Sequence, residues 1–376
     1  MSVLLAPNGR PFAASPADAP LRGPKVLSLV GDESACALWR TWMPFAELRR
    51  RNYPAEWVGL SDPLLGLVRL EAFDAVVLNR LSWKAEGQAH AADWFDDVRA
   101  RVKAVLYECD DDLFTPFMVE QQKAGIEREK PREVIEAERE ATLWAMRQCA
   151  GVTVTTQHLA TTVRRFTNAP VEVVPNMVDV DWFRFVQRQA PRRVPGLTIG
   201  WAGGHRPDAD LREMAVAWGR IAKRYPHVTF VVMGYQADAI WGRVPHGRIK
   251  AVPWMGPLEY PKGLVDVDIG CCPLEERPFN RCKTPIKAWE YALSGAAVVA
   301  SPTVYRHSIE HAANGYLATT AEEWEYALAS LIEHEGLRRF MAAELKRDVM
   351  AKWTVRRGVW RWPAAWARLL SGAAAP

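Results

Sequence analysis

The chain has 376 residues, of which 49% are hydrophobic and 24% are charged, and its formal net charge is +4. These values exclude a disordered or fibrous protein, and the length suits two domains rather than one. The charge excess is too small to indicate stable binding of nucleic acid, although it is compatible with binding anionic groups such as phosphates.

The N-terminal residues do not resemble a signal peptide, because their apolar stretch is short and has no basic flank. No segment approaches the ~20 apolar residues of a membrane span. The six cysteines form no CxxC pair and no zinc-ligand spacing. We therefore expect a cytoplasmic, reducing location. The seventeen tryptophans are scattered, which leaves peripheral membrane contact open.

The first half of the chain alternates between short β-rich runs and helical patterns. Residues 1–24 are rich in Pro, Ala and Gly, and they predict a flexible lead-in. The alternation that follows is typical of a parallel sheet covered by helices on both faces. Strands are predicted at 25–30, 55–58, 73–79, 102–107, 152–155 and 171–174, and helices at 34–51, 131–150 and 157–166.

The alternation stops in residues 181–196, where two prolines, a glycine and several arginines suit an interdomain linker. It then restarts. Strands are predicted at 197–201, 228–233, 248–252, 268–272 and 297–300, and helices at 208–225, 285–294, 322–333, 335–351 and 357–371. The predicted organisation is an N-terminal domain at 25–180, a C-terminal domain at 197–352, and a closing helix and tail at 353–376. Ligands of such sheets bind beyond the carboxyl ends of the strands.

The most informative stretch surrounds the predicted helix 285–294. Thr284 is a suitable N-cap, and Pro285 suits the first helical position. Lys283 and Lys287 flank the helix start, where each exposed cation opposes the macrodipole at a cost of roughly 0.3–1 kcal/mol. Two lysines there are explained if an anion such as a diphosphate binds between them. Alternatively, Lys287 pairs with Glu290 and Lys283 is solvated.

Glycines follow two predicted strands of the second half. Gly203 and Gly204 precede His205, Arg206 and a predicted helix. Glycine lets a ligand approach the backbone, and the start of a helix favours a phosphate. Ordinary tight-turn glycines are an equal alternative. Gly234 is either a turn residue or part of a nucleobase pocket.

Three adjacent carboxylates, Asp110, Asp111 and Asp112, follow a predicted buried strand. Such a cluster is costly unless it is solvated or binds something. The open interpretations are acceptor binding or proton acceptance, a metal-binding D-x-D, and a solvated loop that caps a helix. Arg40 and Arg80 either reach the same edge of the domain or form surface ion pairs.

Over residues 25–350 the order of these motifs resembles retaining GT-B glycosyltransferases, in particular glycosyltransferase family 4 (glycosyl transferases group 1) and its relatives. Glu290, followed after a short interval by Gly295 and an AAVVAS strand, matches the second glutamate of the family's donor motif. The first glutamate falls at Cys282, which is a departure from the family. Asn280, Lys283 and Lys287 fit the pattern of a subgroup.

The resemblance implies an α/β GT-B fold of two Rossmann-like, doubly wound domains, with a C-terminal helix that closes back. It implies transfer of a sugar from a nucleotide-diphosphate sugar to an unidentified acceptor, with retention and without a metal or other cofactor. Glu290 would hold the ribose hydroxyls. The expected catalytic residues are Lys283, Lys287, Asp110 and Asp112. The expected donor-binding residues are Gly203, Gly204, His205, Arg206, Gly234, Glu275, Asn280, Arg281, Cys282, Thr284 and Glu290.

Three other functions remain open at this point. The first is a metal-dependent GT-A-type transferase that uses Asp110 and Asp112. The second is a nucleotide-sugar epimerase of the same two-lobed fold, and the third is a non-catalytic protein that binds nucleotides or sugars. For a transferase, the acceptor could be a glycan, a lipid-linked sugar, a protein or a modified nucleobase, because fold analogy does not identify it.

Overall fold

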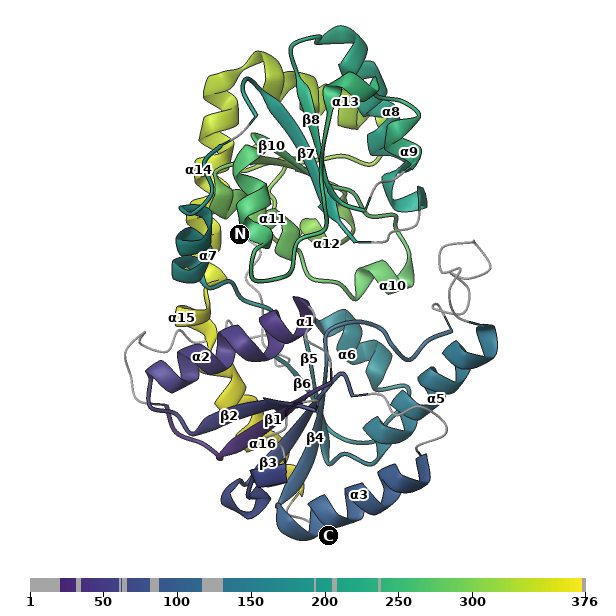
Figure 1. The fold of residues 1–376 in the computed structure, drawn as a ribbon, viewed down its shortest axis with the longest axis vertical. Coiled ribbons are helices and arrows are strands. Elements are labelled where there is room, and N and C mark those ends of the chain that lie inside the picture. Colours follow the sequence, from purple (N-terminus) through teal and green to yellow (C-terminus); the bar gives the residue numbers. More distant parts are fainter. Residues whose placement is uncertain are drawn as a thin grey trace. The chain divides into compact units, whose positions relative to one another are not determined.

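A computed structural model describes residues 21–31, 35–60, 62, 66–81, 88–116, 131–192, 194–204, 208–235 and 238–373. Contacts between residues divide the chain into two compact units (Figure 1). The N-terminal unit holds the described residues up to Met177, the segment Arg281–Thr284 and the chain from Val355 onward. The C-terminal unit holds Val178–Asn280 and Pro285–Thr354.

The N-terminal unit is built on a six-stranded parallel sheet in the order β2-β1-β3-β4-β5-β6. Its strands are β1 (Val26–Val30), β2 (Ala55–Gly59), β3 (Ala75–Asn79), β4 (Ala104–Cys109), β5 (Gly151–Val154) and β6 (Val171–Val173). Its helices are α1 (Ala35–Ala37), a π-helical turn (Leu38–Trp42), α2 (Met43–Arg50), α3 (Gln88–Arg101), α5 (Arg132–Arg147), α6 (Gln157–Val163), α15 (Val355–Gly358) and α16 (Arg361–Ala373).

The C-terminal unit is built on a second six-stranded parallel sheet, in the order β12-β11-β10-β7-β8-β9. Its strands are β7 (Thr198–Gly203), β8 (Thr229–Gly234), β9 (Ile249–Val252), β10 (Ile269–Cys272), β11 (Ala297–Ala300) and β12 (Tyr316–Leu317). Its helices are α7 (Val180–Gln187), α8 (Asp208–Arg224), α9 (Asp238–Trp241), α10 (Pro278–Arg281), α11 (Ile286–Ser294), α12 (Pro302–Tyr305), α13 (Ala321–Glu333) and α14 (Glu335–Lys352).

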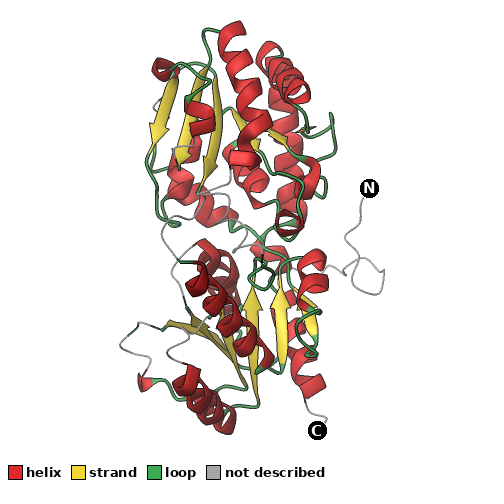
Figure 2. Ribbon diagram, turned by 90° about the vertical axis from the view of Figure 1, so that its right-hand side faces the viewer, coloured by secondary structure: helices red, strands yellow, loops and turns green. Residues whose placement is uncertain are grey.

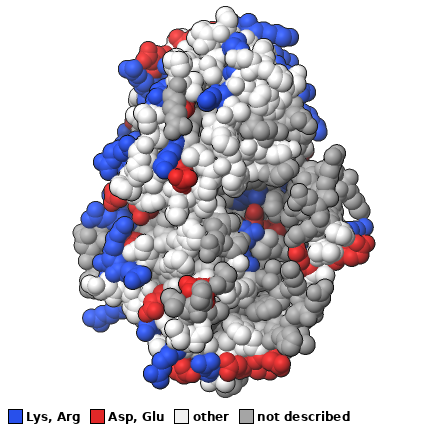
Figure 3. Space-filling model, viewed as in Figure 1, with Lys and Arg blue, Asp and Glu red and all other residues white. Residues whose placement is uncertain are grey.

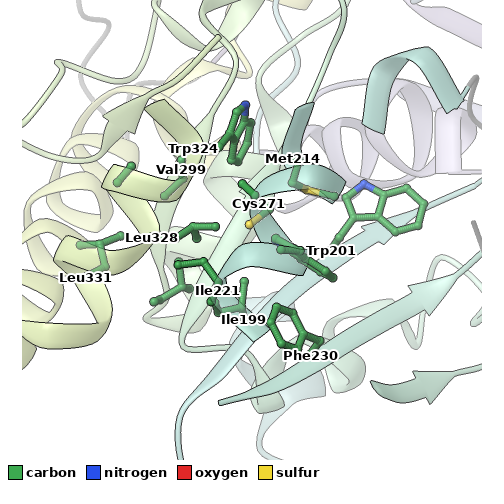
Figure 4. Packing of buried hydrophobic residues seen from close by; sticks show 14 of the residues in the cluster. Ile199, Trp201, Met214, Ile221, Phe230, Cys271, Val299, Trp324, Leu328 and Leu331 are labelled. Atoms are coloured by element: carbon green, nitrogen blue, oxygen red, sulfur yellow. The ribbon is translucent and has the colours of Figure 1, made fainter. Parts of the chain in front are cut away.

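Helices cover both faces of each sheet, as Figure 2 shows for each unit taken alone. The central strands β1, β3, β4, β7, β10 and β11 are buried almost throughout, which explains their continuous apolar sequences. In the C-terminal unit, Trp201 and Phe230 from the strands pack with Ile221, Trp324 and Leu328 from the helices (Figure 4). The predicted pair of Rossmann-like α/β units is therefore confirmed.

Several elements differ from the prediction, which lacks the short helices α9, α10 and α12. Helix α3 was not predicted, although Phe95 and Val98 are buried with the spacing of a helical face. Strand β12 was not predicted either, because two residues are too few to show the alternation of a strand. Residues 181–196 were interpreted as a linker, yet α7 occupies the start of that range, where Asp179 caps it through the amides of Asp181 and Trp182. Residues 1–20 of the predicted lead-in lie outside the described residues.

Candidate active site

The carboxyl end of the second sheet is made by two glycines that pair in register, Gly203 of β7 and Gly234 of β8. A Cβ atom on Gly234 would lie 2.5 Å from the carbonyl oxygen of Gly203, and Gly234 has φ +89°. A Cβ atom on Gly203 would lie 2.5 Å from the ring of Trp201. Both positions therefore favour glycine, because neighbouring atoms of the protein fill the space that a side chain would need.

Trp254 lies against this edge. A Cβ atom on either Gly204 or Gly234 would stand 3.4 Å from its indole ring, so the ring packs directly on the glycine backbone. Nevertheless, 69% of Trp254 is exposed to solvent. A wide, rigid aromatic surface at a strand edge can receive another planar group. The sequence analysis did not select Trp254, because nothing in its local pattern separates it from the other tryptophans.

Helix α11 is buried around its whole circumference over residues 288–293, and Gly295 ends it in the left-handed C-cap conformation, φ +85°. The prediction that Thr284 caps this helix is wrong. The helix begins at Ile286, and Pro285 occupies the N-cap position without a side-chain cap. Thr284 therefore lies one residue too far from the helix to reach its free amides.

Lys287, in the first turn of α11, reaches the carboxyl end of the sheet. Its Nζ donates a hydrogen bond to the carbonyl oxygen of Ala202 in β7, at 2.7 Å, and lies 5.9 Å from the centre of the Tyr260 ring. The sequence analysis left open a simple pair between Lys287 and Glu290. In the structure, the ammonium is anchored on β7 and also acts on the Glu290 carboxyl through its charge.

Glu290 is only 5% exposed, one turn beyond Lys287 on the same helix. Burial raises the pKa of Glu290 to about 7, against the opposing effect of the Lys287 charge. The Tyr260 side chain lies nearby, and burial raises its pKa well above the usual value. A buried carboxyl beside a cation at the carboxyl end of a parallel sheet is a strong indication of a ligand site.

The loop after β10 is organised by a residue that the sequence analysis missed, Asp210. Its buried carboxylate accepts hydrogen bonds from the Asn280 side chain at 2.8 Å and from the Glu275 amide at 2.9 Å. The Asn280 amide also donates to the Glu275 carbonyl at 3.0 Å. The Glu275 side chain pairs with Arg277, whereas Arg281 is exposed. Asn280 and Glu275 thus shape the loop. The only available signal for Asp210 was an acid at a helix start.

Lys283 and Cys282 lie in a segment that the contacts assign to the N-terminal unit. Lys283 Nζ is 3.1 Å from both carboxylate oxygens of Asp111. Cys282 is fully buried in the apolar core of that unit. Its carbonyl oxygen accepts from the Thr156 hydroxyl at 3.0 Å, and its sulfur lies 3.8 Å from the Thr162 hydroxyl. Burial raises the pKa of the Cys282 thiol to about 12, which makes it a packed, unreactive thiol.

The other two carboxylates of the acidic cluster have different partners. Asp110 pairs with Arg80, at 3.2 Å between Oδ1 and Nη1. Asp112 is buried and accepts hydrogen bonds from the amides of Phe114 and Thr115 and from the Thr115 hydroxyl. Asp112 therefore holds the turn that follows β4, and it is buried rather than part of a solvated loop.

The alternative that Arg40 forms a surface ion pair is wrong, because its ion pair is buried. Arg40 is 1% exposed, and its Nε donates to Glu108 of β4 at 2.6 Å. A π-helical turn, rather than a regular α-helix, carries it. The predicted site residues His205 and Arg206 lie outside the described residues.

Among the described residues, no group of three or more His, Cys, Asp or Glu side chains is placed to hold a metal ion. No helix there is long and apolar enough to cross a membrane. On the face seen in Figure 3, Lys and Arg side chains are interspersed with Asp and Glu.

Comparison with known proteins supports the fold of the two α/β units. Residues 196–334 match the family model described as glycosyl transferases group 1. Sucrose-phosphate synthase from Thermosynechococcus elongatus superposes with a TM-score of 0.62 over 92% of this chain and 99% of that one, at 12% identity. The chain has the GT-B glycosyltransferase fold. The matched range of this GT-B chain contains the glycine edge, Trp254, Lys287 and Glu290.

Two further relatives extend the comparison of this GT-B chain. HepE from Anabaena, in complex with UDP and glucose, has a TM-score of 0.55, 15% identity, and coverage of 93% of this chain and 98% of that one. The putative teichuronic acid biosynthesis glycosyltransferase TuaH of Bacillus subtilis strain 168 is 28% identical over 209 residues. That alignment covers 52% of this chain and 49% of TuaH, so the chain matches about half of that relative's length.

Proposed function

We propose that this protein is a glycosyltransferase that transfers a sugar from a nucleotide-diphosphate sugar to a glycan acceptor, with retention at the anomeric carbon and without a required metal ion. The observation that carries the proposal is Lys287, anchored on the end of β7 at the start of α11, with Glu290 buried one turn later. The family match over residues 196–334 supports it. The HepE complex with UDP and glucose makes UDP-sugars the first donors to test.

The donor would occupy the carboxyl edge of the second sheet. Its diphosphate would lie at the start of α11, where the helix dipole and the Lys287 ammonium favour negative charge. The Glu290 carboxylate would accept hydrogen bonds from the ribose hydroxyls. The exposed ring of Trp254 would stack on the nucleobase.

In the reaction, the bond between the anomeric carbon and the diphosphate oxygen breaks, and the acceptor hydroxyl forms a new bond to that carbon from the same face. Negative charge grows on the departing nucleoside diphosphate. The Lys287 ammonium would stabilise that charge more strongly in the transition state than in the ground state. The acceptor proton would leave with the diphosphate.

Two finer statements are also part of the proposal. A cytoplasmic location is supported by the six cysteines, all of which are free thiols. A glycan acceptor is suggested by the name of TuaH, which places that relative in teichuronic acid biosynthesis. Because Cys282 is buried in the core of the N-terminal unit, we propose that it takes no part in recognising the donor sugar.

A thermal-shift screen tests the proposal. UDP, GDP, ADP, CMP, dTDP and their sugar conjugates are added with EDTA or with Mn²⁺ to wild type, Lys287→Ala and Lys283→Ala. We expect one nucleotide to raise the melting temperature in EDTA, and Lys287→Ala to lose most of that shift. A shift that needs Mn²⁺ and survives both substitutions would instead support a metal-dependent site at Asp110 and Asp112, and no shift with any nucleotide would contradict the proposal.

A further inference from the structure

A buried polar network crosses the N-terminal unit, and its centre is the Arg40–Glu108 pair. Arg40 Nε donates to Glu108 Oε1 at 2.6 Å, and the Thr153 hydroxyl bonds to the other carboxylate oxygen. The guanidinium lies 4.4 Å from the centre of the Trp362 ring. Burying such a pair costs desolvation free energy that its attraction does little more than offset. Stability alone therefore does not explain why the network is there.

The network continues from Arg40 to Asn176, which is 5% exposed and lies just after β6. Arg40 Nη1 donates to the Val174 carbonyl at 2.7 Å and to Asn176 Oδ1 at 2.9 Å. A guanidinium is only a donor, so the Asn176 oxygen must face it. The Asn176 amide nitrogen then points the other way, and it donates to Thr284 Oγ1 at 3.1 Å.

Thr284 ends the segment Arg281–Thr284, whose neighbouring residues are also tied to this unit. The Cys282 carbonyl is held by Thr156 at 3.0 Å, and Lys283 is held by Asp111 at 3.1 Å. Only Pro285 separates Thr284 from helix α11, which carries Lys287 and Glu290. The network therefore ends at the chain position that leads into the proposed donor-binding helix.

We propose that Asn176 is a positioning residue for donor binding: it connects the buried Arg40–Glu108 pair to Thr284 and thereby fixes the entry to α11 and the backbone beside Lys283. This inference rests on the proposed function. Groups that bind a ligand need support from residues whose own orientation is locked, because small displacements weaken every contact that they make. Asn176 meets that condition, since its amide oxygen faces the buried Arg40 and its amide nitrogen donates to Thr284.

One feature of Arg40 strengthens this assignment. Its Nη2 is buried and has no hydrogen-bond partner among the described residues. A buried unsatisfied donor costs about 1–3 kcal/mol. The arginine thus gives up stability while its other two nitrogens hold Glu108, Val174 and Asn176 in place. This pattern is expected of a network that specifies a position rather than one that only stabilises a core.

The test compares five variants with wild type, one of them a control. Thr284→Val removes the acceptor with almost no change of shape, and Thr284→Ser keeps it. Asn176→Ala and the double variant Asn176→Ala/Thr284→Val complete a double-mutant cycle. Thr142→Val is the matched control, because the Thr142 hydroxyl is also buried in this unit and donates to the Glu138 carbonyl at 2.9 Å. The readouts are the calorimetric Kd for the nucleoside diphosphate that wild type binds and the free energy of unfolding.

We expect Thr284→Val to weaken nucleotide binding about 3- to 10-fold, the usual range for one hydrogen bond, and Thr284→Ser to bind like wild type. The double variant should bind no more weakly than Asn176→Ala. Thr142→Val should lose stability without losing affinity. If Thr284→Val binds as tightly as Thr142→Val, or if Thr284→Ser fails to recover binding, the inference is overturned while the proposed function stands. If wild type binds no nucleotide, the proposed function fails and the inference fails with it.

Discussion

Each unit buries one glutamate beside a cation near the carboxyl end of its sheet, and the two pairs are built differently. In the N-terminal unit, Glu108 of β4 is paired with Arg40. In the C-terminal unit, Glu290 of α11 lies in the field of Lys287. Burial raises the pKa of each carboxyl to about 7. The shared feature is therefore the buried carboxyl, and the cation makes the difference.

Arginine presents a planar fork of donors, which suits fixed partners, whereas lysine presents a compact charge on a flexible stem. Arg40 uses its fork on Glu108, a backbone carbonyl and Asn176, all of which are protein groups. Lys287 is anchored on a single backbone carbonyl at the glycine-rich sheet edge. A buried carboxyl alone therefore does not mark a ligand site, and the cation beside it and the accessible surface around it separate the two cases.

The largest effect, a loss of stability, is expected when the Arg40–Glu108 pair of the N-terminal unit is broken. Arg40→Met leaves Glu108 buried without its cation, which should lower the free energy of unfolding by about 3–5 kcal/mol at pH 8, above the Glu108 pKa. The control is Arg132→Met, which removes an exposed pair with Glu136 and should cost at most about 0.5 kcal/mol. Chemical denaturation measures both. Equal losses in the two variants would show that the buried network contributes no more than a surface pair.

The next largest effect concerns the Lys287–Glu290 pair of the C-terminal unit, and we expect it in the affinity for the nucleoside diphosphate. Lys287→Ala should weaken binding of the nucleoside diphosphate about 10- to 100-fold, because it removes a charge-assisted contact to the diphosphate. Lys346→Ala is the matched control, since Lys346 Nζ also donates to a backbone carbonyl of this unit, that of Leu293, at 2.9 Å. Calorimetric titration would contradict the assignment if both variants lost affinity equally.

A pH dependence is expected from both glutamates. A carboxyl whose pKa is raised on folding holds its proton more tightly in the native state, so its stabilising contribution is complete below about pH 4.5 and is lost as the pH rises towards 7. The steepest loss is about 1.4 kcal/mol per pH unit for each group. As the pH rises across that range, the stability of Glu108→Gln and of Glu290→Gln should each increase relative to that of wild type. A difference that stays constant from pH 4 to 8 would contradict the raised pKa values.

The smallest effect is expected at Trp254. Trp254→Ala should weaken nucleotide binding about 3- to 10-fold through loss of stacking, and Trp254→Phe should retain most of the affinity. Phe340→Ala, which removes a 55% exposed ring on α14, should leave the affinity unchanged. Comparison of the three Kd values shows whether Trp254 contacts the base. An unchanged Kd in Trp254→Ala would remove this ring from the donor site.

The sequence was enough to predict the fold, because buried parallel strands are continuous apolar runs that alternate with amphipathic helices. Strand β11 and helix α13 show this most clearly. Helix α7 escaped prediction because the prolines and arginines that follow it hide its helical spacing. Helix α3 escaped because its buried positions, Phe95 and Val98, are surrounded by charged and small residues.

The candidate site was predictable only where the chemistry is local. Lys287 was selected because it lies at a predicted helix start, and Glu290 because the residues around it resemble a family motif. Contacts with residues 20 to more than 100 positions away in the sequence determine the roles of Trp254, Asp210 and Asn176. Cys282 and Asp112 were selected from motifs, but burial and local hydrogen bonds decide what they do in the structure. Long-range partners of this kind cannot be read from one sequence.

A crystal structure with the nucleoside diphosphate selected by the screen, grown in EDTA and again with Mn²⁺, tests the central claim most directly. We predict that in both crystals the diphosphate lies within hydrogen-bond distance of Lys287 Nζ, with the ribose on Glu290 and the base against Trp254. A nucleotide bound through Mn²⁺ to Asp110 and Asp112, and absent from the crystal grown in EDTA, would contradict the account.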